Sequence, residues 1–135
     1  MEFGLQPGLT ANVSFEVKSE HLAPALGSGD ARVFSTPMLV AGIEAAACAI
    51  TRPRLPRTLT TVGTHVDIRH KAATPLGMLV TFEATLVEIS ANGKGLSFSV
   101  SARDEAGEIC EGRHERVIVD WRKFEAKTAA RKKDA

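Results

Sequence analysis

The sequence predicts an α+β domain in which one central helix is wrapped by a curved five-stranded antiparallel sheet. Three observations carry this prediction. Residues 9–18 alternate between apolar and polar side chains, residues 38–50 form an almost unbroken apolar stretch, and residues 58–121 contain four strand-like segments separated by turn signals. A period of two is typical of a strand with one buried face, whereas a long apolar run behind a proline-containing start is typical of a buried helix.

Size and composition indicate a single globular domain. The chain has 135 residues, of which 44% are hydrophobic and 24% charged. One core fits this length, and the composition excludes a disordered chain, a collagen and a membrane bundle. We expect the domain to span residues 1–121.

Residues 122–135 differ from the rest of the chain because they hold six basic and two acidic residues. The formal net charge of the whole chain is +1, so the body before this tail carries a net negative charge and offers no global attraction to nucleic acid. The simplest expectation for the tail is a solvated, partly frayed end, and phosphate binding is the alternative.

The cysteines and the N-terminus indicate a reducing compartment. Cys48 and Cys110 are the only cysteines, and neither lies in a metal-knuckle or CxxC spacing, so we expect free thiols in the core. The first residues lack the basic and apolar regions of a secretory signal. The apolar stretch 38–50 is shorter than the roughly 20 residues that span a bilayer. We therefore expect a cytoplasmic protein that contacts no membrane.

The first strand is expected over residues 9–18, where the apolar positions are Leu9, Ala11, Val13, Phe15 and Val17. Residues 19–33 contain proline, glycine and aspartate and favour a loop that can act as a flap. The helix is expected to begin at Ser35-Thr36-Pro37, with Thr36 as a capping hydroxyl, and to end near Thr51, before two prolines.

The remaining strands form an antiparallel meander. The segment 58–70 is strand-like, Met78 to Leu86 and Leu96 to Ala102 alternate with a buried parity, and Asn92-Gly93 is a hairpin signal between the last two. The last strand is expected over residues 109–121, with a shift of parity around Arg116 that suggests a bulge.

Glu44 is the only ionisable side chain between Met38 and Ile50. Burial of an unpaired carboxylate costs several kcal/mol, so its presence requires a reason. One explanation is that Glu44 lies on a solvent-facing stripe of the helix. However, no polar residue accompanies Glu44 at a spacing of three or four. The other explanation is a carboxylate that serves as a base or nucleophile in an apolar pocket.

His70 ends a strand whose inner parity is marked by Val66 and Ile68, so its ring should face the core side. A histidine satisfied by the following turn is the alternative. His65 and Asp67 have the opposite parity, which argues against a metal site with His70. Thr36 lies where the helix presents free N–H groups that can stabilise an anionic intermediate. Cys48 has no basic neighbour and is assigned to the core, and His21 and His114 receive no role.

Several motifs of other enzyme classes are absent from the sequence. It contains neither GxGxxG nor GxxxxGK[ST], and no GxSxG. Six phenylalanines, one tryptophan and no tyrosine leave little material for base stacking. Phosphate-loop enzymes, hydrolases of the nucleophile-elbow type and single-strand binders are therefore disfavoured.

Four segments together resemble the hot-dog-fold acyl-CoA thioesterases, in particular the group similar to fluoroacetyl-CoA thioesterase. The order and spacing of these segments carry the resemblance, which extends from the first strand to about Lys127. The segments are Val33-Phe34-Ser35-Thr36-Pro37 leading to Glu44, Val62-Gly63-Thr64-His65-Val66, the turn His70 to Gly77, and Gly112-Arg113-His114-Glu115-Arg116.

The resemblance implies a catalytic group of Thr36, Glu44 and His70. Glu44 would act as nucleophile or general base on the thioester carbonyl, His70 as its acid/base partner, and Thr36 as a hydrogen-bond donor to carboxylate or substrate. The backbone N–H of Gly63, or of the helix start, would donate to the thioester oxygen. The family also implies a homodimer or a tetramer with the site at a subunit interface, and an acyl-CoA substrate with no separate cofactor or metal.

One departure concerns the acyl group. The fluoroacetyl specialists carry aromatic lid residues between the first strand and the helix, whereas residues 26–32 here contain none. A glycine-rich flap closes less tightly and is expected to admit other short or medium acyl chains. The alternatives are a hot-dog hydratase, whose Asp/His signature we do not find, and a non-catalytic acyl-CoA binding or dimerisation module.

Overall fold

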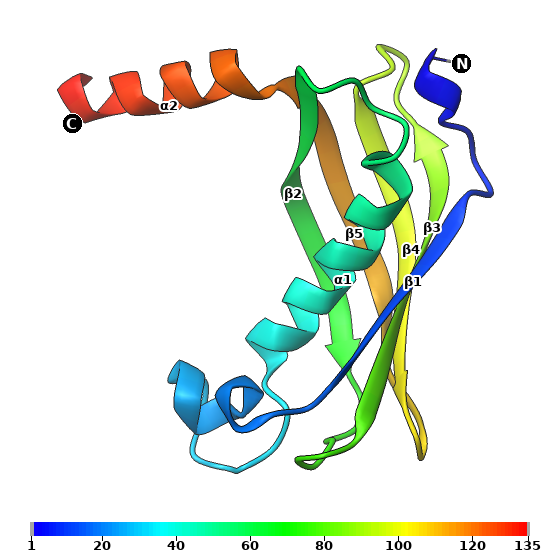
Figure 1. Cartoon of the computed structure of the whole chain (residues 1–135), viewed down its shortest axis with the longest axis vertical. Coiled ribbons are helices and arrows are strands. Elements are labelled where there is room, and N and C mark those ends of the chain that lie inside the picture. The colour runs from blue at the N-terminus through cyan, green and yellow to red at the C-terminus, as the bar shows by residue number, and fades with distance from the viewer. Residues whose placement is uncertain (1, 135) are drawn as a thin grey trace.

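The computed structural model of the protein, which describes residues 2–134, has the expected α+β architecture (Figure 1). One antiparallel sheet has the strand order β1-β3-β4-β5-β2. Its members are β1 (Thr10–Glu16), β2 (Leu59–His70), β3 (Leu79–Ile89), β4 (Gly95–Asp104) and β5 (Gly107–Asp120). The expected meander is wrong for the strand that follows the helix, because β2 pairs with β5 and not with β3, so only β3, β4 and β5 form a meander. The long helix α1 (Thr36–Thr51) crosses the concave face of this curved sheet, so the predicted fold class is confirmed.

The core lies between α1 and the sheet. Val80, Phe82, Ala84 and Leu86 on β3 are buried, as are the equally spaced apolar residues of β4, so the predicted inner faces of both strands are confirmed. The hairpin between them turns at Asn92 and Gly93, and Gly93 has a positive φ of 77° that favours glycine.

Gly42 sets the distance between α1 and the sheet. A Cβ atom at this position would lie 2.4 Å from the ring of Phe82. The small residue therefore lets the aromatic ring pack directly against the helix backbone, which explains the thin, alanine-rich helix that the sequence encodes.

The expectation that the parity of β5 changes at Arg116 is wrong. Arg116 is only 7% exposed and shares the inner face of β5 with His114 and Ile118. The irregularity near it lies on β2, where the register shifts between Gly63 and His65. An arginine can point inward where it has enough hydrogen-bond partners, as Arg116 does.

A second register shift lies between Ala102 and Arg103, in the pairing of β4 with the first half of β5. There the neighbours Ile109 and Cys110 are both buried, so the change of parity in β5 occurs at its beginning.

The segments outside the sheet contain more helix than expected. Residues 19–33 include the short 3-10 helices η2 (Ser19–His21) and η3 (Ala23–Leu26), and another, η1 (Glu2–Gly4), precedes β1. The basic tail is the helix α2 (Trp121–Asp134), which projects away from the body in Figure 1. Residues 122–133 are exposed, as expected for a solvated tail, but they are helical and not frayed. No helix within residues 2–134 has the length and apolarity that crossing a bilayer requires.

β2 lies at one edge of the sheet and is largely exposed on residues 63–67. Val66 on this strand is 37% exposed. An edge strand of this length presents unpaired N–H and C=O groups along one side, which is the usual template for pairing with a second chain.

Candidate functional site

The N-terminus of α1 brings Thr36 to His70. Ser35 is the N-cap, since its hydroxyl accepts a hydrogen bond from the N–H of Met38 at 3.3 Å. The expectation that Thr36 caps the helix is therefore wrong by one position, and its hydroxyl is free for another partner. Thr36 Oγ1 lies 2.8 Å from His70 Nδ1. Pro37 fits the first turn because that turn needs no N–H from it.

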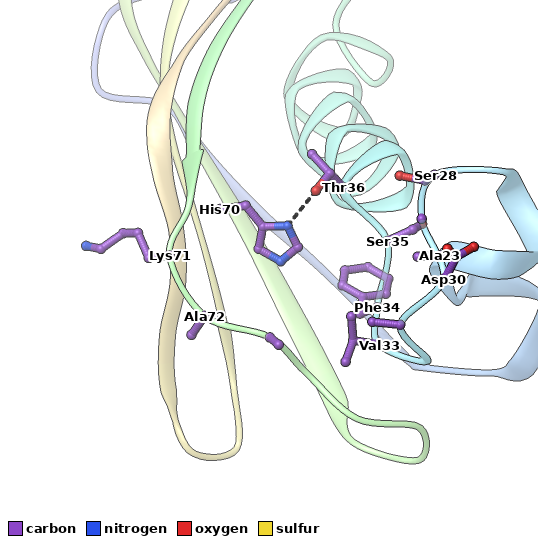
Figure 2. Close-up of a pocket in the computed structure, with 13 residues that line it drawn as sticks. Ala23, Ser28, Asp30, Val33, Phe34, Ser35, Thr36, His70, Lys71 and Ala72 are labelled. Carbon is purple, nitrogen blue, oxygen red and sulfur yellow. Dashed lines mark hydrogen bonds between the residues drawn. The ribbon is translucent and has the colours of Figure 1, made fainter.

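His70 ends β2, and its ring faces α1 as the parity argument predicted (Figure 2). Its Nε2 is buried and has no hydrogen-bond partner within residues 2–134. Burial lowers the pKa of His70 below its ordinary value, an effect that the backbone of Ala72 only partly offsets. A neutral imidazole with one committed and one uncommitted nitrogen is suited to proton transfer.

A pocket of about 370 Å³ opens beside this ring. One wall is formed by the turn after His70, and the other by the segment that precedes α1 (Figure 2). We call residues 23–33 of the latter the lid segment. Apart from Val33, its pocket-lining residues are small or polar, and they include Ser28 and Asp30.

Glu44 lies farther along α1 and has a charged partner that the sequence analysis did not identify. Its side chain is 41% exposed, and its Oε2 lies 3.1 Å from Nη1 of Arg116. Ala41 and Ala45 on the same side of α1 are exposed, so Glu44 lies on a solvent-facing stripe of the helix and not in an apolar pocket. It lies half-buried at the side of β2, held by an inward-pointing arginine.

Arg116 is the centre of a buried polar cluster, which we call the Arg116 cluster. Its Nε donates to Thr61 Oγ1 at 2.8 Å, and its Nη2 donates to the Thr61 carbonyl at 3.0 Å. Its Nη1 lies 3.2 Å from His114 Nε2, in addition to its contact with Glu44. The guanidinium thus has protein partners for all three nitrogens, which stabilises its burial.

His114 belongs to the same cluster, although the sequence analysis gave it no role. Its Nδ1 lies 2.8 Å from the carbonyl oxygen of His65, and its ring stacks on Phe98. Burial is the main cause that lowers the pKa of His114. The signal that could have found both residues is parity, since His114 and Arg116 alternate with Ile118 on the inner face.

Gly63 lies beside the Glu44 carboxylate. A Cβ atom at this position would lie 2.7 Å from Glu44 Oε2 and 3.2 Å from Arg116 Nη1. No side chain fits there without moving the carboxylate. The backbone of β2 consequently approaches Glu44 closely at this one point.

The predicted residues thus form two groups within one chain. Glu44 follows Thr36 by eight positions on α1, a distance of about 12 Å along the helix axis. Gly63 and His70 are seven positions apart on β2, about 23 Å for an extended strand. One chain therefore brings Thr36 to His70 and Glu44 to Gly63, and it does not bring the two pairs to one carbonyl.

The remaining candidates lie apart from these groups. His65 and Asp67 are exposed, and within residues 2–134 no group of three potential ligands is placed to hold a metal ion. Cys110 is buried and its pKa is raised by burial to about 11, which makes it a poor nucleophile. Cys48 is only partly buried.

The fold is shared with solved structures of thioesterases. The fluoroacetyl-CoA thioesterase FlK superimposes with a TM-score of 0.89 at 32% identity, covering 94% of this chain and 97% of FlK. A hypothetical protein of Thermus thermophilus, described as a thioesterase superfamily member, gives a TM-score of 0.86 at 28% identity, covering 96% and 94%. These similarities define a hot-dog domain of the thioesterase class.

A narrower family follows from the sequence. The family model of fluoroacetyl-CoA-specific thioesterases matches residues 17–122. The fluoroacetyl-CoA thioesterase of Streptantibioticus cattleyicolor is 40% identical over 95 residues, which cover 70% of this chain and 67% of that protein. The chain belongs to the FlK family of thioesterases, as the resemblance of its motifs predicted.

Proposed function

We propose that the protein hydrolyses short acyl-CoA thioesters to the free acid and coenzyme A. The observation that carries the proposal is the Thr36–His70 pair at the mouth of a pocket in a chain of this family. The substrate is not assigned to fluoroacetyl-CoA, because the lid segment has no aromatic residue between Leu26 and Arg32.

In the proposed reaction the thioester carbonyl carbon gains an oxygen from water, the C–S bond breaks, and a proton passes to the sulfur of coenzyme A. Glu44 acts on the carbonyl carbon directly or through water, and His70 moves the proton. Thr36 orients the imidazole through Nδ1, which leaves Nε2 to take or give the proton. The N–H of Gly63 serves as donor to the developing oxyanion. No separate cofactor or metal enters this scheme.

The distances within one chain favour a site built by two copies. Because β2 is an exposed edge strand, a second copy can extend the sheet by antiparallel pairing of the two β2 strands. Pairing centred between Val66 and Asp67 lays His70 opposite Gly63 of the partner subunit. Thr36 and His70 would then face Glu44 of the partner subunit, and a dimer would hold two such sites. We propose this homodimer, or a tetramer built from it, in the cytoplasm.

The test is release of coenzyme A from a panel of short and medium acyl-CoA thioesters, followed as free thiol, with Glu44→Gln alongside. Glu16→Gln is the matched control, since Glu16 is an exposed carboxylate on β1. We expect turnover by the wild type and the control, and a loss of about 10³-fold in the Glu44 variant. Sedimentation of the same samples reports whether the active species is a dimer.

A non-catalytic acyl-CoA binding module is the alternative from a different class. Tight binding of acyl-CoA without thiol release would support it and overturn the proposed hydrolysis. The Thr36–His70 pair argues against it, because a binder gains nothing from an unpartnered imidazole nitrogen buried beside the pocket.

A further inference from the structure

The pocket beside His70 contains three polar groups that no other side chain uses. His70 Nε2 is buried and unpartnered, as described above. Across the pocket, the lid segment contributes the Ser28 hydroxyl and the Asp30 carboxylate (Figure 2). Within residues 2–134 neither of these two side chains makes a hydrogen bond or an ion pair to another residue.

Among the described residues that line the pocket, Lys71 is the only other charged one, and it does not compensate Asp30. The Nζ of Lys71 forms ion pairs with Glu108 and Glu111. Figure 2 shows its side chain on the far side of the β2 strand end, directed away from the pocket. Asp30 therefore has no ion-pair partner among the residues that line the pocket.

The lid side also leaves room for more than an acetyl group. The pocket-lining residues Ala23, Gly29 and Ala31 are small, and the pocket volume is about 370 Å³. One water molecule takes about 30 Å³ of liquid volume, so an acyl chain of several carbons fits. Pockets of this size select ligands through a few convergent polar groups, and Ser28 and Asp30 are two such groups.

We propose that the acyl group this enzyme prefers carries a hydroxyl near its far end, which donates to Asp30 with Ser28 as second partner. The same carboxylate repels acyl groups that end in a carboxylate. This inference rests on the proposed thioesterase function and specifies its substrate class. Thr36 and His70 act at the thioester, whereas Ser28 and Asp30 recognise the other end of the acyl chain.

The experiment compares kcat/KM for three acyl-CoA thioesters with four-carbon acyl groups: 3-hydroxybutyryl-CoA, butyryl-CoA and succinyl-CoA. We expect the hydroxylated substrate to exceed butyryl-CoA by about tenfold, since the pocket is open and the hydrogen bond is only partly desolvated. Succinyl-CoA should be the poorest of the three.

Two variants of Asp30 separate hydrogen bonding from charge. Asp30→Ala should abolish the preference for the hydroxyl and raise relative activity on succinyl-CoA. Asp30→Asn keeps an acceptor oxygen and removes the charge, so it should retain part of the hydroxyl preference while accepting succinyl-CoA. Glu125→Gln on α2, remote from the pocket, should leave all three ratios unchanged.

Equal kcat/KM for 3-hydroxybutyryl-CoA and butyryl-CoA in the wild type would overturn the inference and leave the proposed hydrolysis standing. A hydroxyl preference that survives Asp30→Ala would overturn the role of Asp30. Absence of thiol release from every substrate would instead overturn the proposed function, so the two failures are distinguishable.

Discussion

Two polar groups contact α1, the Arg116 cluster and the Thr36–His70 pair. They differ in how completely their hydrogen bonds are satisfied. In the Arg116 cluster, all three guanidinium nitrogens have protein partners, and the side chain is 7% exposed. In the Thr36–His70 pair, one contact of 2.8 Å holds the ring and Nε2 has no partner within residues 2–134. A saturated cluster fixes geometry, whereas an unsaturated pair retains the capacity to bind and to exchange a proton. Under the proposed function, the first group would position Glu44 and the second would transfer the proton.

The largest effect that tests this comparison is expected at His70. His70→Gln should lower kcat by about 10²-fold, because general acid–base catalysis contributes about that much. Thr36→Val should cost less, and the double variant should lose less than the product of the single losses, since Thr36 acts through the ring. A steady-state cycle of the three variants measures this coupling.

Glu125→Gln is the control for that cycle, because Glu125 is an exposed residue of α2 that does not line the pocket. Strictly multiplicative losses in the double variant would mean that Thr36 and His70 act independently and that their contact is incidental.

Substitutions in the Arg116 cluster should lower the stability of the protein. Arg116→Met leaves Thr61, His114 and Glu44 without their shared donor, and we expect a loss of about 2 kcal/mol in the free energy of unfolding, reduced by the partial exposure of Glu44. Arg113→Met, on the exposed face of the same strand, should change stability by less than about 0.5 kcal/mol. Urea denaturation of both variants checks this. Equal losses would contradict the central role of Arg116.

Gly63→Ala should separate positioning from folding. The added methyl group must displace the Glu44 carboxylate, so we expect a loss of about tenfold in kcat with little change in stability. Gly42→Ala is the matched comparison: its methyl group meets the Phe82 ring and should cost about 1–3 kcal/mol in stability. Activity assays and thermal denaturation of both variants distinguish the two outcomes. An unchanged kcat in the Gly63 variant would argue against a role for this strand position.

The smallest expected effects are those of pH. Burial lowers the pKa of both His70 and His114 from the ordinary 6.5, so the unfolded chain binds more protons than the folded chain just below that pH. Stability present above pH 6.5 should therefore be lost as pH falls through the folded-state pKa values. The acid limb of kcat should lie below pH 6.5 and disappear in His70→Gln, whereas the stability change from His114 should remain. An acid limb that persists without His70 would assign it to another group.

Sequence reasoning predicted the framework because β1, β3 and β4 carried a simple period of two and the helix one apolar stretch. Parity and the helix start singled out His70 and Thr36 separately because both are local properties, and the family resemblance alone grouped them. Sequence reasoning missed Arg116 and His114 although they share the parity of Ile118, because a buried arginine or histidine needs partners, here from β2, α1 and β4, that the alternation does not identify. It failed at α2 because a polar exposed helix has no apolar period to detect.

The lid segment and the proposed catalytic residues belong to different parts of the fold, which affects how this enzyme can diverge. Residues 24–32 are exposed, whereas Thr36, Glu44 and His70 are held by α1 and β2 on either side of the core. Substitutions in the exposed part of the lid segment can therefore exchange one acyl preference for another at little cost to folding. Selection can act on the two modules separately, and a lineage of such enzymes can acquire new substrates by neutral drift in one loop while its reaction chemistry stays constant.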